Sequence, residues 1–150
     1  MSWLKITAVV IALIVIVYFA SLSYLTRHDR IKDEGERQLA DCPPTPNCVS
    51  SLASNDAKKV EALPIKGGNK QTSWQNLLQA IKQAGGQILI DDGHYVHAVF
   101  TSTIFRFKDD LEALLNEDHI DIRSASRAGK SDLGKNRKRV ENIREIYRAH

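Results

Sequence analysis

An uncharged apolar run from Ile6 to Leu25 limits what this chain can fold into more than any other feature. At 1.5 Å of rise per residue, a helix of that length measures about 30 Å, the thickness of the hydrocarbon core of a bilayer. A core helix of a soluble domain would carry a polar stripe, which this run lacks. Trp3 and Tyr24 lie near its ends, where aromatic rings favour the membrane interface. The sequence therefore predicts a transmembrane helix, with membrane lipid around residues 6–25 as its partner.

A cleavable signal peptide is the alternative interpretation, because Lys5 precedes the apolar run and Ser21 and Ser23 suit a cleavage site before Tyr24. We favour the uncleaved anchor, since the run is long for a signal peptide. The remaining chain suffices for one hydrophobic core. The expected organisation is a transmembrane anchor (or signal peptide) at 1–25, a charged spacer at 26–41 and a globular domain at 42–150.

Cys42 and Cys48 are the only cysteines, and three prolines lie between them. Prolines exclude helix and favour a stiff loop, which is able to bring two Cα atoms within the roughly 4.4–6.8 Å of a disulfide. Free buried thiols are a second interpretation, and a metal site is a third. The spacing fits neither a thioredoxin-type site nor a zinc knuckle, and no second Cys/His pair lies nearby. We predict a structural disulfide, no metal and no cofactor.

Two opposing arguments bear on which side of the membrane the globular domain lies. Arg27, Arg30 and Lys32 follow the apolar run, which weakly favours a cytoplasmic domain by the positive-inside rule. A disulfide instead implies an oxidising compartment. We give the cysteines more weight and expect a single-pass protein of the cell envelope, with its domain on the periplasmic or extracytoplasmic side.

Periodicity predicts an α+β domain. Apolar residues at helical spacing predict helices over 72–84 and 135–148. Residues 109–116 fit a helix or a strand. Short connections and an Asp-Gly turn favour a meander. The expected fold is an N-terminal transmembrane helix, then a four-stranded antiparallel sheet packed by two helices. Strand signals cover 87–90, 94–103 continuing through 104–107, 120–124 and, as a short strand, 60–65.

Several motifs occur in one order: CPPTPNCVS from Cys42, HAVFTS from His97, FRFKDD from Phe105, and RSASRAGKSDLGKNRKR from Arg123. Together they resemble the family known as domain of unknown function 1499, over roughly 42–148. The resemblance implies a small protein, often exported or membrane-attached, with no established activity. The chain departs from the family's pattern at Lys130 and Lys135.

The basic C-terminal part holds the candidate site. From Arg123 to His150, nine Lys/Arg against three acids give a charge of +6, which suits an anionic neighbour or a solvated helix face. In a strand, Arg123 and Arg127 point to one face, and Ser124 and Ser126 to the other. Arginines beside a helix N-terminus would suit a carboxylate or phosphate. The candidate anion site comprises Arg123, Ser124, Ser126, Arg127, Ser131, Asp132, Asn136 and Arg139.

The alternative interpretation, which we favour, is that the arginines pair within the protein: Arg123 or Arg127 pairs with Asp109, Asp110 or Asp132. Residues 128–131 match the last part of the P-loop motif, but the glycine that the motif requires five residues before Gly129 is missing. His94 and His97 face opposite sides of a strand, so they share no metal. His97 with Ser102 or Ser126 is a conceivable base and nucleophile, although a structural histidine fits better.

These features predict a membrane-tethered, non-enzymatic binding or assembly module whose partner is an anionic ligand, a lipid or an envelope protein. No catalytic residue is assigned, and no nucleic acid is expected. A small hydrolase or transferase acting on an anionic substrate is the alternative. A structural envelope protein is the third hypothesis.

Overall fold

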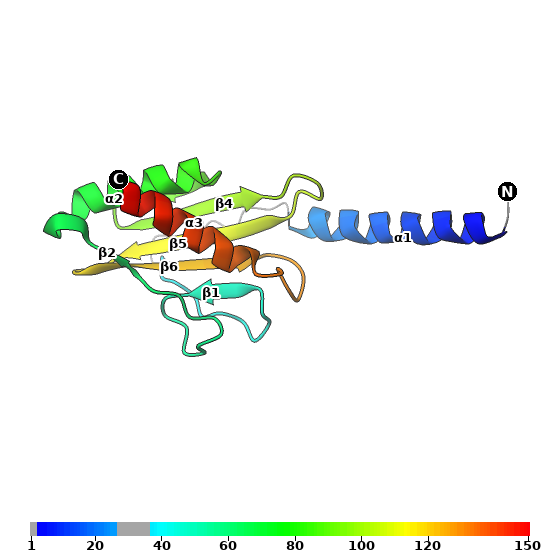
Figure 1. Cartoon of the computed structure of the whole chain (residues 1–150), viewed down its shortest axis with the longest axis horizontal. Helices are drawn as coiled ribbons and strands as arrows, with labels where there is room; N and C mark the ends of the chain where they lie inside the picture. Colours follow the sequence, from blue (N-terminus) through cyan, green and yellow to red (C-terminus); the bar gives the residue numbers. More distant parts are fainter. Residues whose placement is uncertain (1–2, 27–36) are drawn as a thin grey trace.

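A computed structural model describes residues 3–26 and 37–150 of the chain (Figure 1). Most of the expected spacer, including the three basic residues weighed for orientation, lies outside these residues. A 3-10 turn at Lys66–Gly68 precedes α2. The elements in chain order are α1 (Trp3–Leu25), β1 (Cys48–Ser50), β2 (Leu63–Pro64), α2 (Lys70–Gln83), β3 (Gln87–Asp91), β4 (Tyr95–Thr101), β5 (Lys108–Leu115), β6 (His119–Ser126) and α3 (Lys135–Ala149).

The antiparallel sheet has the strand order β1-β6-β5-β4-β3, with β2 also pairing on β6. The expected four-stranded meander is present as β3 to β6. The sheet has six strands instead of four, because β1 and β2 add along the outer edge of β6, where Cys48 pairs with Ala125 and Leu63 with Ile120. The short strand expected in 60–65 is present as β2, whereas β1 has three residues, too few to produce a recognisable alternation.

Two short segments need comparison with the predicted strands: one was predicted wrongly, and the other was left ambiguous. Residues 104–107, expected as strand, belong to the loop between β4 and β5, which Ser102 and Phe107 close through two hydrogen bonds of 2.9 Å. Ile104 at its tip is 82% exposed, so its hydrophobicity does not report a core position. The ambiguous 109–116 segment is strand β5, with Leu111 and Ala113 on the core face.

Helices α2 and α3 lie side by side on one face of the sheet (Figure 1). Both helices were predicted, and their apolar stripes face the core as expected. Gly86 follows α2 and lies so close to Ile81 and Phe100 that a Cβ there would approach them within 3 Å. The largest fully buried side chains include Trp74, Leu77, Ile81, Val140, Ile143 and Tyr147.

Helix α1 projects from one end of the domain, next to the β4–β5 and β6–α3 loops (Figure 1). Among the described residues it is the one helix long and apolar enough to cross a membrane. Its C-terminal end meets the domain, where Ser23 and Thr26 are buried. Phe19 stacks on Phe105 of the β4–β5 loop with ring centroids 4.8 Å apart. The loops at this end of the domain therefore lie alongside the last turns of the apolar helix.

Candidate functional site

The predicted site residues divide between the two faces of the sheet. Along β6, Arg123 pairs in register with Glu112 and Ser124 with Leu111. Leu111 belongs to the core face beneath the helices, so Ser124 points there and Arg123 points to the opposite face. The alternation predicted from sequence is correct, and it places Arg127 with Arg123, away from the serines.

On the helix side, Asn136 is the centre of a polar cluster that joins α3 to the sheet. Its Nδ2 donates to Ser126 Oγ at 3.0 Å and to the carbonyl of Asn47 at 2.9 Å. Its Oδ1 accepts from the Ser124 hydroxyl at 2.7 Å and from Arg139. Arg139 also donates to Asp109 at 2.5 Å. Four predicted residues thus meet in one cluster, with their hydrogen bonds directed inward.

The carboxylate of Asp132 occupies the place where an external anion was envisaged. One oxygen accepts the N–H of Gly134 at 3.0 Å, and the other accepts the N–H of Asn136 at 2.7 Å, at the start of α3. Ser131 is exposed, and its hydroxyl oxygen accepts the N–H of Leu133 at 3.3 Å. The chain thus supplies its own anion to this helix N-terminus.

The opposite face of the sheet carries a buried ionic network that sequence reasoning described only in part. Arg127 binds both oxygens of Asp110, which is the internal pairing considered above. Arg123 instead pairs with Glu112 at 2.9 Å, and the Tyr95 hydroxyl donates to the same carboxylate at 2.7 Å. Burial and the bond to Glu112 raise the pKa of Tyr95, so the phenol stays neutral.

Asp110 is the most strongly perturbed carboxyl group of this network. Burial opposes its ionisation, but hydrogen bonds from His97 and Arg127, with the Arg127 charge, outweigh burial and lower its pKa to about 2. The His97 Nε2 lies 2.7 Å from Asp110. His97 is on the face opposite Ser124 and Ser126, so the structure does not bring this imidazole to Ser126, one of the two nucleophiles considered.

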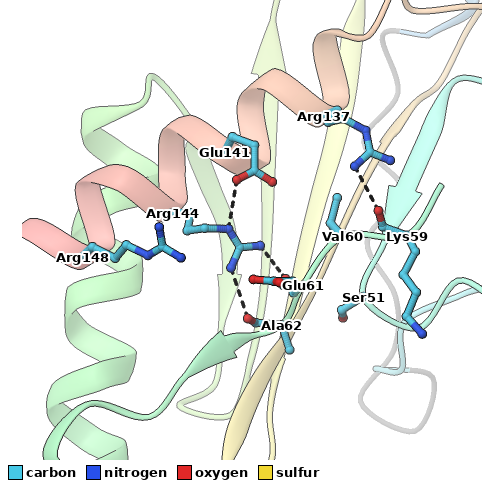
Figure 2. Close-up of a pocket in the computed structure, with 9 residues that line it drawn as sticks. All are labelled: Ser51, Lys59, Val60, Glu61, Ala62, Arg137, Glu141, Arg144 and Arg148. Carbon is cyan, nitrogen blue, oxygen red and sulfur yellow. Dashed lines mark hydrogen bonds and ion pairs between the residues drawn. The ribbon is translucent and has the colours of Figure 1, made fainter. Parts of the chain in front are cut away.

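Arg137 and Arg144 were not among the predicted site residues. They border a groove of about 500 Å³ between α3 and residues 51–62 (Figure 2). Arg144 donates to the carbonyls of Glu61 at 2.5 Å and Ala62 at 3.2 Å. Arg137 donates to the carbonyl of Lys59 at 3.0 Å. Both guanidinium groups therefore fasten α3 to the segment that leads into β2.

A larger groove of about 700 Å³ opens at the end of the domain nearest α1. It lies between the last turns of α1, the β4–β5 loop, the end of α2 and the β6–α3 loop. Sequence reasoning missed it, because its walls come from four separate parts of the chain. Apolar lining comes from Phe19, Leu22, Phe100, Phe105 and Phe107, and polar lining from Ser126, Ser131, Asp132, Lys135 and Arg139 among others.

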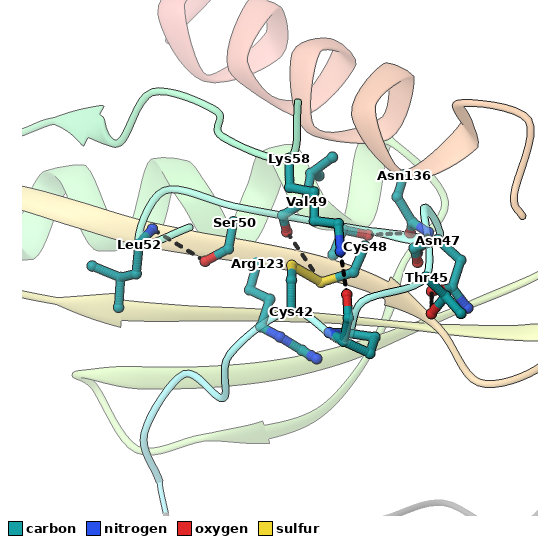
Figure 3. The surroundings of a disulfide bond; sticks show 12 residues. Cys42, Thr45, Asn47, Cys48, Val49, Ser50, Leu52, Lys58, Arg123 and Asn136 are labelled. Carbon is teal, nitrogen blue, oxygen red and sulfur yellow. Dashed lines mark hydrogen bonds between the residues drawn. A yellow bond between two sulfur atoms is a disulfide. The ribbon is translucent and has the colours of Figure 1, made fainter. Parts of the chain in front are cut away.

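The predicted disulfide is present: Cys42 and Cys48 are joined, with Cα atoms 5.6 Å apart (Figure 3). Lys58 donates to the carbonyl of Pro43 within the bridged loop. The bridge ends where β1 begins, so it fixes the start of an edge strand. Across the described residues, no three His, Cys, Asp or Glu side chains gather as a metal site would require.

These features define a small α+β domain with a disulfide-fixed edge, carried on an apolar N-terminal helix. The family model for a protein of unknown function, DUF1499, matches residues 38–146, and the chain belongs to that family. The resemblance inferred from the motifs is thereby confirmed. No curated protein matches the chain.

Proposed function

We propose that this protein is a membrane-tethered, non-enzymatic binding module that holds an anionic bilayer lipid in the groove beside α1. The observation that carries the proposal is the amphipathic lining of that groove. Phenylalanine rings form one wall next to the apolar helix. The exposed cation Lys135 lies on the polar wall, together with Arg139, whose charge is paired with Asp109. A lipid has the matching chemistry, because its acyl chains suit the aromatic wall and its phosphate suits a cation.

The position of the groove supports a lipid over a ligand dissolved in water. Phe19 and Leu22 of α1 contribute directly to its lining. A helix with the length and composition of α1 places these residues within or next to the bilayer. The groove then opens at the level of the lipid headgroups, where a phospholipid enters without leaving the membrane.

Three arginines are paired with acids of the same chain, which supports a rigid scaffold and not a catalytic centre. Arg123, Arg127 and Arg139 each bind a carboxylate of the same chain at 2.5–2.9 Å. This pairing also favours a structural envelope protein, which is the second candidate function. His97 lies on the sheet face opposite Ser126, which argues against the hydrolase or transferase alternative built on that pair.

Lipid retention tests the proposal. The full chain would be reconstituted with equal amounts of phosphatidylglycerol and phosphatidylcholine, extracted in mild detergent and analysed by native mass spectrometry. We expect the wild type to retain phosphatidylglycerol, and Lys135→Glu at the groove to reduce the amount of bound phosphatidylglycerol several-fold. The matched control is Lys138→Glu, an exposed site on the same helix outside the lining. An acid in the first turn suits a helix, so lost lipid would not reflect a weakened α3.

The groove itself is probed by Ser131→Trp, which places a bulky ring into the lining from an exposed loop position. This change should exclude both lipid classes. Equal lipid retention by the wild type, Lys135→Glu and Ser131→Trp would refute the binding module and leave the structural role as the better account.

A further inference from the structure

Two loops at the end of the domain nearest α1 present apolar side chains to the surroundings. Ile104 in the β4–β5 loop is 82% exposed, and Leu133 in the β6–α3 loop is 85% exposed. Phe105 beside Ile104 is 38% exposed. Outside α1, these are three of the four large hydrophobic side chains exposed among the described residues, the other being Leu52. Their gathering at one end of the domain indicates a contact surface.

The depth of these loops relative to α1 follows from one ring contact. Phe105 stacks on Phe19 with centroids 4.8 Å apart, and Phe107 lies 6.2 Å from the same ring. Phe19 precedes the end of α1, at Leu25, by six residues, which is about 9 Å along a helix. If α1 spans the bilayer, the tip of the β4–β5 loop lies below the membrane surface, at the depth typical of interfacial segments.

Basic residues accompany the apolar tips. Arg106 directly follows Phe105, and Lys130 precedes Leu133 by three residues; both cations are exposed. Their long side chains are able to reach the headgroup layer while the apolar neighbours enter the acyl region. Apolar tips flanked by cations match a membrane surface that contains anionic lipid.

We propose that the β4–β5 and β6–α3 loops form a second membrane contact, inserting Ile104, Phe105 and Leu133 into the leaflet at the C-terminal end of α1. Arg106 and Lys130 bind anionic headgroups there. The proposal rests on the membrane-spanning role of α1 proposed above, but not on a lipid in the groove. The occupant is the bilayer because the stacked rings place the loops beside the apolar helix, where lipid is the surrounding medium. The contact holds the domain end-on against the membrane.

The test places a fluorescent label on single cysteines introduced into the full chain, without reductant so that the native disulfide stays closed. The variants are Ile104→Cys and Leu133→Cys at the loop tips, and Ile11→Cys within α1. Glu117→Cys is the control, because its side chain is 97% exposed at the β5–β6 turn, away from α1 (Figure 1). Each protein enters nanodiscs of phosphatidylcholine and phosphatidylglycerol that carry a doxyl-lipid quencher.

We expect quenching at Ile104→Cys and Leu133→Cys to exceed that at Glu117→Cys several-fold. Adding Arg106→Glu and Lys130→Glu should lower it, whereas Lys82→Glu, at an exposed site on α2, should not. Loop labels quenched no more than the control, with Ile11→Cys strongly quenched, would overturn this proposal alone. An unquenched Ile11→Cys would overturn the membrane anchor and this proposal together. Loop labels shielded from aqueous iodide but not quenched by the lipid would indicate a protein partner and also refute the proposal.

Discussion

Arg127 binds both carboxylate oxygens of Asp110. Its Nε lies 3.0 and 2.9 Å from the two oxygens, and its Nη2 lies 2.5 Å from one of them. The Arg127 side chain is only 3% exposed, and that of Asp110 is 16% exposed. His97 of β4 contacts the same carboxylate. Asp110 on β5 therefore connects β4 with the end of β6 through buried polar contacts.

Asp110→Ala should be strongly destabilising, because it leaves the Arg127 guanidinium buried without its anion. Removing one partner of a buried ion pair costs about 3–5 kcal/mol. Urea denaturation of the detergent-solubilised chain, followed by tryptophan fluorescence, measures the change in unfolding free energy. Asp56→Ala, at an exposed loop position, is the control and should stay within about 0.5 kcal/mol of the wild type. A similar small change for Asp110→Ala would show that the pair contributes little.

The same carboxylate predicts an acid-sensitive stability. The pKa of Asp110 is about 2 in the folded protein, below its usual 3.8, so the unfolded chain binds the proton more tightly. The stabilisation is therefore complete above about pH 4 and is lost as the pH falls towards 2, by about 2–3 kcal/mol in total. Urea midpoints measured from about pH 5, above this window, down to about pH 2 should fall less steeply for Asp110→Asn than for the wild type. Parallel curves for the two proteins would contradict the assignment.

Asn136→Ala should loosen α3 from the sheet. The amide is fully buried, and its loss leaves the hydroxyls of Ser124 and Ser126 and the carbonyl of Asn47 without this partner. A buried group left unsatisfied costs about 1–3 kcal/mol. Asn142→Ala is the matched control, since it makes the same change at an exposed position of the same helix. If both variants unfold at the same urea concentration, the cluster does not fasten the helix.

Local patterns in the sequence were sufficient for part of the fold. Apolar spacing of three and four residues identified α2 and α3, because each helix buries one stripe. Alternation along β6 correctly separated Arg123 from Ser124, because strand side chains point to opposite faces whatever the neighbouring strand is. The Cys42–Cys48 bridge was predictable because the two residues are close along the chain and the prolines between them stiffen the loop.

Features that depend on strand register were beyond the sequence. Arg123 pairs with Glu112, a partner not considered, because the β5–β6 register places these residues opposite each other. A slip of one residue would have changed every such partner. Ile104 was wrongly predicted to lie in a strand, since hydrophobicity alone does not distinguish a core residue from one at a loop tip. The groove beside α1 was hidden for a related reason, since four distant segments form it.

Gly86→Ala should destabilise the junction between α2 and β3. An added Cβ would lie 2.7 Å from Ile81 Cγ2 and 2.8 Å from the Phe100 ring, so packed core groups would have to move. Overpacking of this kind costs about 1–3 kcal/mol. The cost should shrink in a Phe100→Leu background, where the ring is absent, and a double-mutant cycle in urea measures the difference. Strictly additive effects of the two substitutions would show that the ring does not cause the strain.

Removing the disulfide should cost only modest stability while loosening one sheet edge. For so short a loop, the chain-entropy model gives about 2 kcal/mol. The double variant Cys42→Ala, Cys48→Ala should lose that amount in urea denaturation and exchange its β1 amide protons faster. The effect should be local, because the bridge ends at the first residue of β1, and the adjacent Asn47 carbonyl accepts the Ser126 N–H at 2.9 Å.

The redox state of this pair in cells also tests the proposed extracytoplasmic side. A disulfide persists in an oxidising compartment and is reduced in most cytoplasms. Whole cells quenched with acid and treated with a maleimide reagent should yield protein that gains no label until a reductant is added. The double alanine variant provides the baseline, since Cys42 and Cys48 are the only cysteines in the chain. Immediate labelling of both cysteines would place the domain on the reducing side of the membrane.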